Sequence, residues 1–142
     1  IKENGIIYFK IDGIYRSKLG LPASRATDLC GSYDSSKGVL TILWCSLPEA
    51  PSTYVNGQWG PQEDPFAGDV INSYNDGPVE DGSIMGPFYE IETSSPGAEL
   101  VPGASLVHTQ KVIHIQGKDE QLVPIVQKLF GADLNVIKTK FQ

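Results

Sequence analysis

The middle of this sequence lacks positive charge. None of the eleven Lys and Arg residues lies between Gly38 and Gln110. The same stretch contains ten acidic residues, namely Glu49, Glu63, Asp64, Asp69, Asp76, Glu80, Asp81, Glu90, Glu92 and Glu99. Binding to a phosphate backbone or to an anionic membrane depends on Lys and Arg contacts, so we expect no nucleic-acid partner. A neutral polar ligand or a cation is more compatible with this composition.

Long apolar runs are also missing. No run approaches the roughly 20 residues that a membrane-spanning helix needs, so we expect no membrane span. The chain begins with Ile1 instead of methionine, and we therefore expect that it has been trimmed. A signal peptide or a further domain upstream is left open, and a removed signal would place the protein in the periplasm or outside the cell.

Cysteine and histidine are scarce, with two residues of each. Cys30 and Cys45 are too few to define a disulfide framework, although a bond between them stays open. Cys45 ends an apolar segment, so we interpret it as a small buried hydrophobic residue. His108 and His114 lie on one predicted strand. At about 3.3 Å per residue their separation along the strand is roughly 20 Å, so they are too far apart to share a metal ion. We expect neither a metal site nor a cofactor.

Sequence motifs for common chemistries are absent as well. The chain contains no Gly-x-Ser-x-Gly elbow, phosphate-binding loop or dinucleotide-binding glycine motif. The segment from Asp69 to Glu80 has the length of a calcium-binding EF-hand loop. However, Ile71 and Ser73 fill two ligand positions and Tyr74 replaces the required glycine, so we reject that interpretation.

The distribution of apolar residues predicts a mostly β protein. Residues 5–12, 39–45, 88–93 and 105–116 are rich in β-branched and aromatic residues and are predicted strands. A turn is expected at 34–38. The strand at 39–45 is apolar on both faces, which is typical of the middle of a sandwich or a large sheet.

The C-terminal segment changes to a helical period. We predict a helix with Asp119 as N-cap and Gly131 as its stop, in which Pro124 falls early enough for a first turn. Its apolar positions are Leu122, Ile125, Val126 and Leu129. A second short helix, capped by Asp133, is predicted after it, so the β body ends in a helical tail.

Residues 46–87 form a long irregular segment with six Pro and six Gly. Structureless loops beyond about 12–15 residues are uncommon in compact domains, so we predict an ordered excursion over one face or edge of the sheet. Residues 68–78 mix an aromatic ring with amides and carboxylates, as carbohydrate sites do, because a ring stacks on a sugar and polar groups bind its hydroxyls. The alternative interpretation is turn chemistry with aromatic residues that pack locally.

Glu90 and Glu92 are two residues apart on a predicted strand and should share one face. Their backbones would lie about 6.6–7 Å apart, so mutual repulsion could raise one pKa toward that of a general acid or base. The alternative is a solvated pair with no chemical role.

Three segments carry a family resemblance. IETS (91–94), LVPGAS (100–105) and LVHTQKVIHI (106–115) resemble the C-terminal portion of galactose mutarotase-like (aldose 1-epimerase) proteins. In those proteins a strand carrying Leu-Glu-Thr-Gln precedes a loop, a Pro-Gly turn and a long strand. GPQEDPFAGDVINSYNDGP (60–78) and GPFYEIETSSP (86–96) resemble an uncharacterised branch of that superfamily. The resemblance to this branch covers most of the chain, from about Phe9 to the terminal helix.

The resemblance implies a large antiparallel supersandwich that binds free sugars in an open cleft. In mutarotases the glutamate of the motif takes the anomeric hydroxyl proton while a histidine protonates the ring oxygen, so Glu92 would inherit the role of base. Ser94 replaces the expected glutamine, and neither His108 nor His114 occupies the positions of the catalytic histidines. Residues 1–142 are therefore expected to form a single domain, the C-terminal part of a larger sandwich with an incomplete active site.

Our first hypothesis is an all-β, antiparallel sandwich that binds or epimerises a neutral sugar or another polyhydroxylated molecule, with Glu92 as base. The predicted substrate-binding residues are Trp59, Asp69, Asn72, Tyr74, Asn75 and Asp76. One alternative is a non-catalytic carbohydrate-recognition module, and another is a structural sandwich without a ligand. Exposed strand edges would favour a homo-oligomer.

Overall fold

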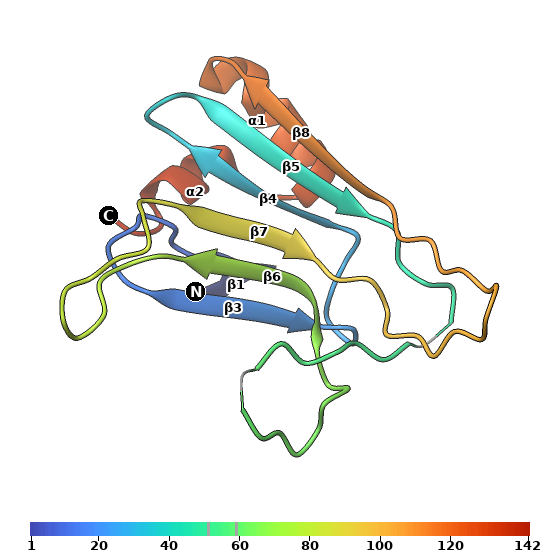
Figure 1. Ribbon diagram of the computed structural model, residues 1–142. Coiled ribbons are helices and arrows are strands. Elements are labelled where there is room, and N and C mark those ends of the chain that lie inside the picture. Colours follow the sequence, from blue (N-terminus) through green and yellow to red (C-terminus); the bar gives the residue numbers. More distant parts are fainter. Residues whose placement is uncertain (51, 59) are drawn as a thin grey trace. The chain divides into compact units, whose positions relative to one another are not determined.

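The computed structural model describes residues 1–50, 52–58 and 60–142 (Figure 1). Strands are followed by two C-terminal helices, in the order β1 (Lys2–Glu3), β2 (Ile6–Ile7), β3 (Ser17–Pro22), β4 (Leu29–Asp34), β5 (Val39–Cys45), β6 (Asp69–Asn75), β7 (Tyr89–Thr93), β8 (Gln110–Gln116), α1 (Asp119–Phe130) and α2 (Leu134–Thr139). The described sheets are β1–β2, β3–β6–β7 and β4–β5–β8. The all-β class with a helical C-terminal tail is confirmed.

The chain divides into two compact units, which we describe separately. The helical unit comprises residues 1–10, 29–44 and 111–142 and contains β1, β2, β4, both helices and most of β5 and β8. The polar-sheet unit comprises residues 11–28 and 45–110 and contains β3, β6 and β7.

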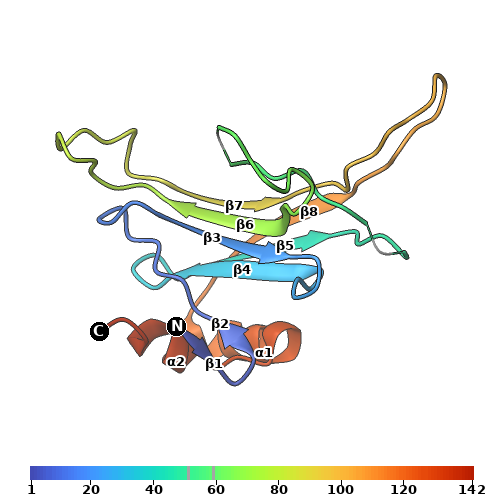
Figure 2. The same cartoon turned by 90° about the horizontal axis from the view of Figure 1, so that it is seen from below.

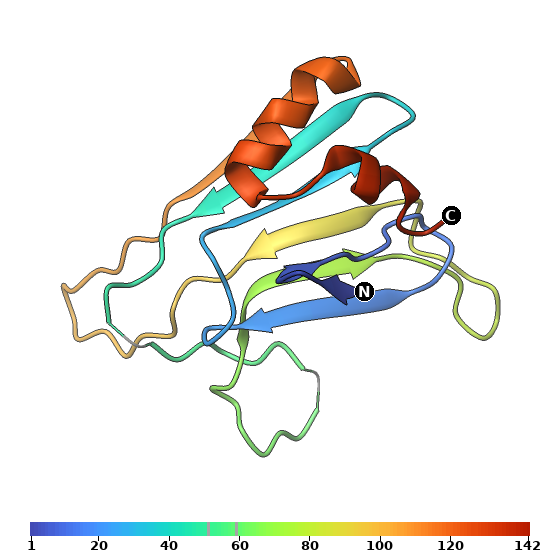
Figure 3. The ribbon, with the colours of Figure 1, turned by 180° about the vertical axis from the view of Figure 1, so that it is seen from behind.

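The core of the helical unit lies between one face of its sheet and the helices (Figure 3). Leu40 and Ile42 of β5 are buried against Leu122 and Val126 of α1 and Leu134 of α2. Alternate residues of a strand face opposite sides, so the even-numbered residues of β5 face the helices. Burial of these apolar side chains is the main favourable contribution to the stability of this unit.

The ends of the two helices agree in part with the ends predicted from the sequence. Gly131 ends α1 in the left-handed conformation at φ 62°, and Asp133 caps α2 by accepting the Asn135 N–H at 2.8 Å, as predicted. Lys118 is the N-cap of α1, and the prediction of Asp119 was wrong by one residue. Pro124 lies in the second turn of α1, so its placement in the first turn was wrong too.

Several strands differ from their predictions. The bounds of β5 and the turn before it are confirmed, but the strand predicted at 105–116 begins only at Gln110. The strand predicted at 5–12 is replaced by the β1–β2 hairpin, because Asn4 and Gly5 both have positive φ and form a two-residue turn. β3 and β4 were not predicted.

In the polar-sheet unit β6 is the central strand, and it pairs antiparallel with β3 and with β7 (Figure 1). The prediction of an irregular excursion over 46–87 was therefore wrong for Asp69–Asn75. Val70 and Ile71 are adjacent and both buried, which hides the alternation that would have signalled a strand. From the end of β7 the chain continues as an extended arm toward β8 (Figure 2).

Candidate functional site

The register of β3, β6 and β7 brings polar residues onto one face of the polar-sheet unit. Gly20, Asn72 and Glu92 lie directly opposite one another across the three strands. Lys18, Tyr74 and Glu90 form the adjacent row. Residues opposite each other in paired strands share a face, so both rows belong to one surface. We call this surface the polar face.

Asp69 also reaches the polar face. A Cβ atom placed on Gly20 would lie 1.9 Å from Asp69 Oδ2, so the Asp69 carboxylate covers the position where a side chain is missing. The register shifts between Leu21 and Pro22, next to Asp69, and such a shift can redirect a side chain. Any residue larger than Gly20 would therefore displace the Asp69 carboxylate from this position.

Glu90 and Glu92 interact with each other on the polar face. Partial burial raises the pKa of Glu92, and repulsion by Glu90 and a hydrogen bond with Glu90 raise this pKa further. The Lys18 ammonium group acts in the opposite direction. A carboxylate with a raised pKa next to a cation is suited to accept a proton from a ligand hydroxyl.

Tyr74 and Asp76 are held in a network at one end of β6. The Tyr74 hydroxyl donates to Asp76 Oδ1 at 2.7 Å, Arg16 donates to the same oxygen at 3.1 Å, and the Gly86 N–H donates to Oδ2 at 2.8 Å. The bond from Tyr74 is the main cause that holds the pKa of Asp76 far below its usual range. The Tyr74 ring packs against Phe88 at 5.9 Å between ring centroids. Because Asp76 is fully buried, it positions Tyr74 and does not line an open site.

Asn75 lies on the opposite face of β6 from Asn72 and Tyr74. Its side chain accepts the Gly13 N–H at 2.9 Å and donates to the Tyr15 carbonyl at 2.8 Å. With an exposed fraction of only 1%, it fastens the segment before β3 to the sheet. It therefore lies apart from the other predicted ligand-binding residues on the polar face. Trp59, also predicted, lies outside the described residues.

Neither histidine lies on the polar face. His108 Nε2 is 3.0 Å from Thr93 Oγ1, and Thr93 points away from its neighbour Glu92 because successive strand residues face opposite sides. Thr93 also donates to Gln110 at 2.6 Å. His114 Nδ1 bonds with Thr41 in the helical unit. The sequence predicts that Thr93 and Glu92 point to opposite sides of the strand, but it does not predict that Thr93 contacts His108.

Sequence reasoning missed Lys18 and Gly20 because it did not predict β3. Their roles depend on pairing with β6, more than fifty residues away in the chain. No local pattern in 17–22 signals this pairing, although alternating Leu19 and Leu21 are compatible with a strand.

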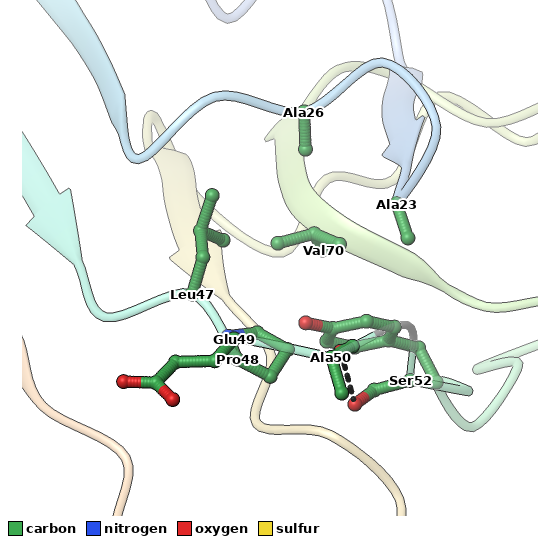
Figure 4. A pocket seen from close by; sticks show the side chains of 9 residues that line it. Ala23, Ala26, Leu47, Pro48, Glu49, Ala50, Ser52 and Val70 are labelled. Atoms are coloured by element: carbon green, nitrogen blue, oxygen red, sulfur yellow. Dashed lines mark hydrogen bonds between the residues drawn. The ribbon is translucent and has the colours of Figure 1, made fainter.

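An apolar pocket of about 300 Å³ is also found in the polar-sheet unit (Figure 4). Its lining is formed by Ala23, Ala26, Leu47, Pro48, Glu49, Ala50, Ser52, Tyr54 and Val70. The Glu49 carboxylate points away from Val70 and the alanines, and Ser52 bonds to the Ala50 carbonyl at 3.2 Å. Binding pockets usually contain a few convergent polar groups, so this pocket is a weaker candidate than the polar face.

The structure limits other chemistries for the residues that it describes. In the described part of the chain, neither Cys30 nor Cys45 belongs to a disulfide, and burial raises the pKa of the Cys45 thiol, as fits a buried hydrophobic residue. Within the described ranges no group of three or more His, Cys, Asp or Glu side chains could hold a metal ion. Among the same residues, no helix has the length and apolar character to cross a membrane.

Fold and site together define an all-β protein with an open polar face on an antiparallel sheet. The family is more specific: residues 1–141 match a family of unknown function, DUF6786, and the chain belongs to it. No curated protein and no solved structure matches the chain.

Proposed function

We propose that this protein binds a neutral sugar on the polar face, as a relative of the galactose mutarotase-like proteins. The observation that carries the proposal is the pair of cross-strand rows, which gathers Asn72, Tyr74, Glu90 and Glu92. Carboxylate and amide groups bind vicinal hydroxyls by pairs of hydrogen bonds. The large acidic excess of this part of the chain disfavours anionic ligands such as sugar phosphates.

Glu92 is the residue proposed to contact the anomeric hydroxyl. Mutarotation needs a base that takes this proton and an acid that protonates the ring oxygen, after which the ring opens, C1 rotates and the ring closes again. Glu92, with its raised pKa, suits the first role. Lys18 is the cationic donor on the same face, and its ammonium group would hydrogen-bond the ring oxygen.

A non-catalytic carbohydrate-recognition role is the second candidate. It is favoured by His108, which contacts Thr93 and so faces away from Glu92. On this proposal the polar face binds the sugar without opening its ring. The two candidates share a site and differ in whether Glu92 transfers a proton.

The test combines calorimetry and polarimetry on a panel of neutral aldoses. We expect Glu92→Gln to weaken binding by about tenfold through loss of a charge-assisted hydrogen bond, and to abolish any mutarotation. Glu99 is an exposed glutamate after β7, so Glu99→Gln is the matched control and should leave sugar binding and mutarotation unchanged. Binding without rate enhancement in the wild type would establish the recognition role. No binding of any aldose would refute the proposal.

The pH profile of any activity offers a further check. The rate of mutarotation should rise with pH as Glu92 ionises, with a midpoint above the ordinary glutamate value because its pKa is raised. Glu90→Gln removes the neighbouring charge and should move that midpoint down. A profile unchanged by Glu90→Gln would show that another group is the base.

A further inference from the structure

The edges of the two larger sheets differ in how they are protected. An edge strand exposes unpaired N–H and C=O groups to other chains, and proteins usually shield it with proline, charge, an irregularity or a covering helix. The edge strands are β3 and β7 in one sheet and β4 and β8 in the other.

Three of these four strands carry such protection. β3 ends in Pro22 with a register shift beside it. β7 carries Glu90 and Glu92, whose charges would oppose those of a pairing copy. β4 is contacted by α1, and Phe130 of that helix closely approaches Gly31.

β8 lacks these features. It has seven residues and contains neither proline nor glycine. Its single charged residue, Lys111, lies over the Trp44 ring at 5.1 Å from the centroid. Val112 and Ile113 are 50% and 47% exposed and face opposite sides, so both faces of the strand offer apolar surface. This combination predicts a strand that pairs readily with another.

The groups of β8 that remain available can be identified from its pairing with β5. The Ser46 N–H donates to the Thr109 carbonyl at one end, and the Gly117 N–H donates to the Gly38 carbonyl at the other. Odd-numbered residues therefore direct their backbone groups toward β5, and even-numbered residues direct theirs outward. In the part of the chain that the structure describes, β5 is the hydrogen-bonded neighbour of β8. The outward residues are Gln110, Val112, His114 and Gln116.

We propose that β8 pairs antiparallel with β8 of a second copy of this chain, with the two-fold axis at Ile113. In this register Gln110 lies opposite Gln116 of the other copy, and Val112 lies opposite His114. These are the outward-facing residues, so every outward N–H and C=O of the strand gains a partner. The interface is isologous and closes after two copies.

The sequence of β8 favours a second copy over an unrelated strand. QKVIHIQ has Gln at both ends and Ile113 at its centre, so the reversed strand presents a similar pattern to itself. Lys111 falls opposite Ile115 of the second copy and not opposite Lys111 of that copy, which avoids a like-charge pair. A strand of this length spans only roughly 23 Å, and one pair of such strands buries less surface than most stable interfaces do, so the dimer should form weakly and depend on concentration.

Sedimentation velocity from about 1 to about 500 μM tests the proposal, because mass action shifts a weak dimer over such a range. We expect the wild type to shift from monomer to dimer. Val112→Pro removes one outward N–H without breaking the ladder to β5, and it should be monomeric throughout. Val112→Thr keeps this N–H and should dimerise like the wild type. A wild type that stays monomeric, or a dimer that survives Val112→Pro, would overturn the proposal.

A cross-link tests the same axis if Val112→Pro fails to fold. In a Cys30→Ser background, Ile113→Cys should form a disulfide-linked dimer, since opposite residues of a non-hydrogen-bonded pair are about 4.5 Å apart at Cα. Val107→Cys is the control: Val107 is 82% exposed but lies off the axis, so it should cross-link far less. Equal cross-linking at both positions, or none at Ile113→Cys, would contradict the register.

Discussion

Asn72 and Asn75 show how side-chain parity separates two identical residues on one strand. Asn72 lies on the polar face opposite Glu92, whereas Asn75 is buried on the other face and holds the backbone of Gly13 and Tyr15. The sequence placed both in one predicted site because both belong to one polar segment. Only a strand assignment for that segment would have separated them.

The two residues therefore form a matched pair for mutation. Asn75→Ala should lower the free energy of unfolding by about 1–3 kcal/mol, because it removes the buried Asn75 amide that bonds the partly buried backbone groups of Gly13 and Tyr15. Asn72→Ala should change stability much less and should weaken sugar binding. Urea unfolding and calorimetry measure the two effects. Loss of stability in Asn72→Ala with intact binding would contradict the assignment of the faces.

At the scale of elements, a polar bridge joins the helical tail to β4, in addition to the apolar core. The Tyr33 hydroxyl of β4 donates to Asp119 Oδ1 at 2.6 Å, and Lys138 of α2 pairs with the same carboxylate. The Lys138 and Tyr33 bonds hold the pKa of Asp119 below its usual range. Burial, followed by the bond to Asp119, raises the pKa of Tyr33 to about 12.

This bridge predicts a pH dependence at the alkaline end. A group whose pKa is raised in the folded state stabilises the fold fully below its ordinary pKa, near 10 for tyrosine, and this contribution is lost as pH rises through about 12. Tyr33→Phe should cost about 1 kcal/mol or less at pH 8, and this cost should shrink toward pH 12. Urea unfolding at both pH values checks this. A cost that does not change with pH would contradict the role of the bridge.

At the scale of the whole molecule, charge is distributed unequally between the two units. The polar-sheet unit has three Lys and Arg against twelve Asp and Glu, a net charge of −9. The helical unit has eight Lys and Arg against five Asp and Glu, a net charge of +3. Charge of one sign destabilises a compact state through repulsion, and salt screens it.

Salt should therefore stabilise the polar-sheet unit more than the helical unit. We expect amide hydrogen exchange of β6 and β7 to slow when NaCl is raised from about 10 mM to about 500 mM, a range over which the screening length falls several-fold. The amides of α1 serve as the internal control and should respond less. Faster exchange in β6 at high salt would show that repulsion does not limit its stability.

Some features followed from the sequence because they depend on neighbours in the chain. The all-β class, the bounds of β5, the Gly131 stop and the shared face of Glu90 and Glu92 follow from periodicity and local propensity. Membership of β6 in a sheet was missed because its buried residues do not alternate.

The tertiary structure alone decided which residues meet on the polar face. Lys18 and Gly20 join Asn72 and Glu92 only through the register of β3 with β6, and His108 is excluded only through its contact with Thr93. Register depends on hydrogen bonds between segments far apart in the chain, and a shift of one residue would exchange the two faces. The sequence by itself therefore determined the class of fold and the candidate carboxylates, and the pairing of strands determined their neighbours.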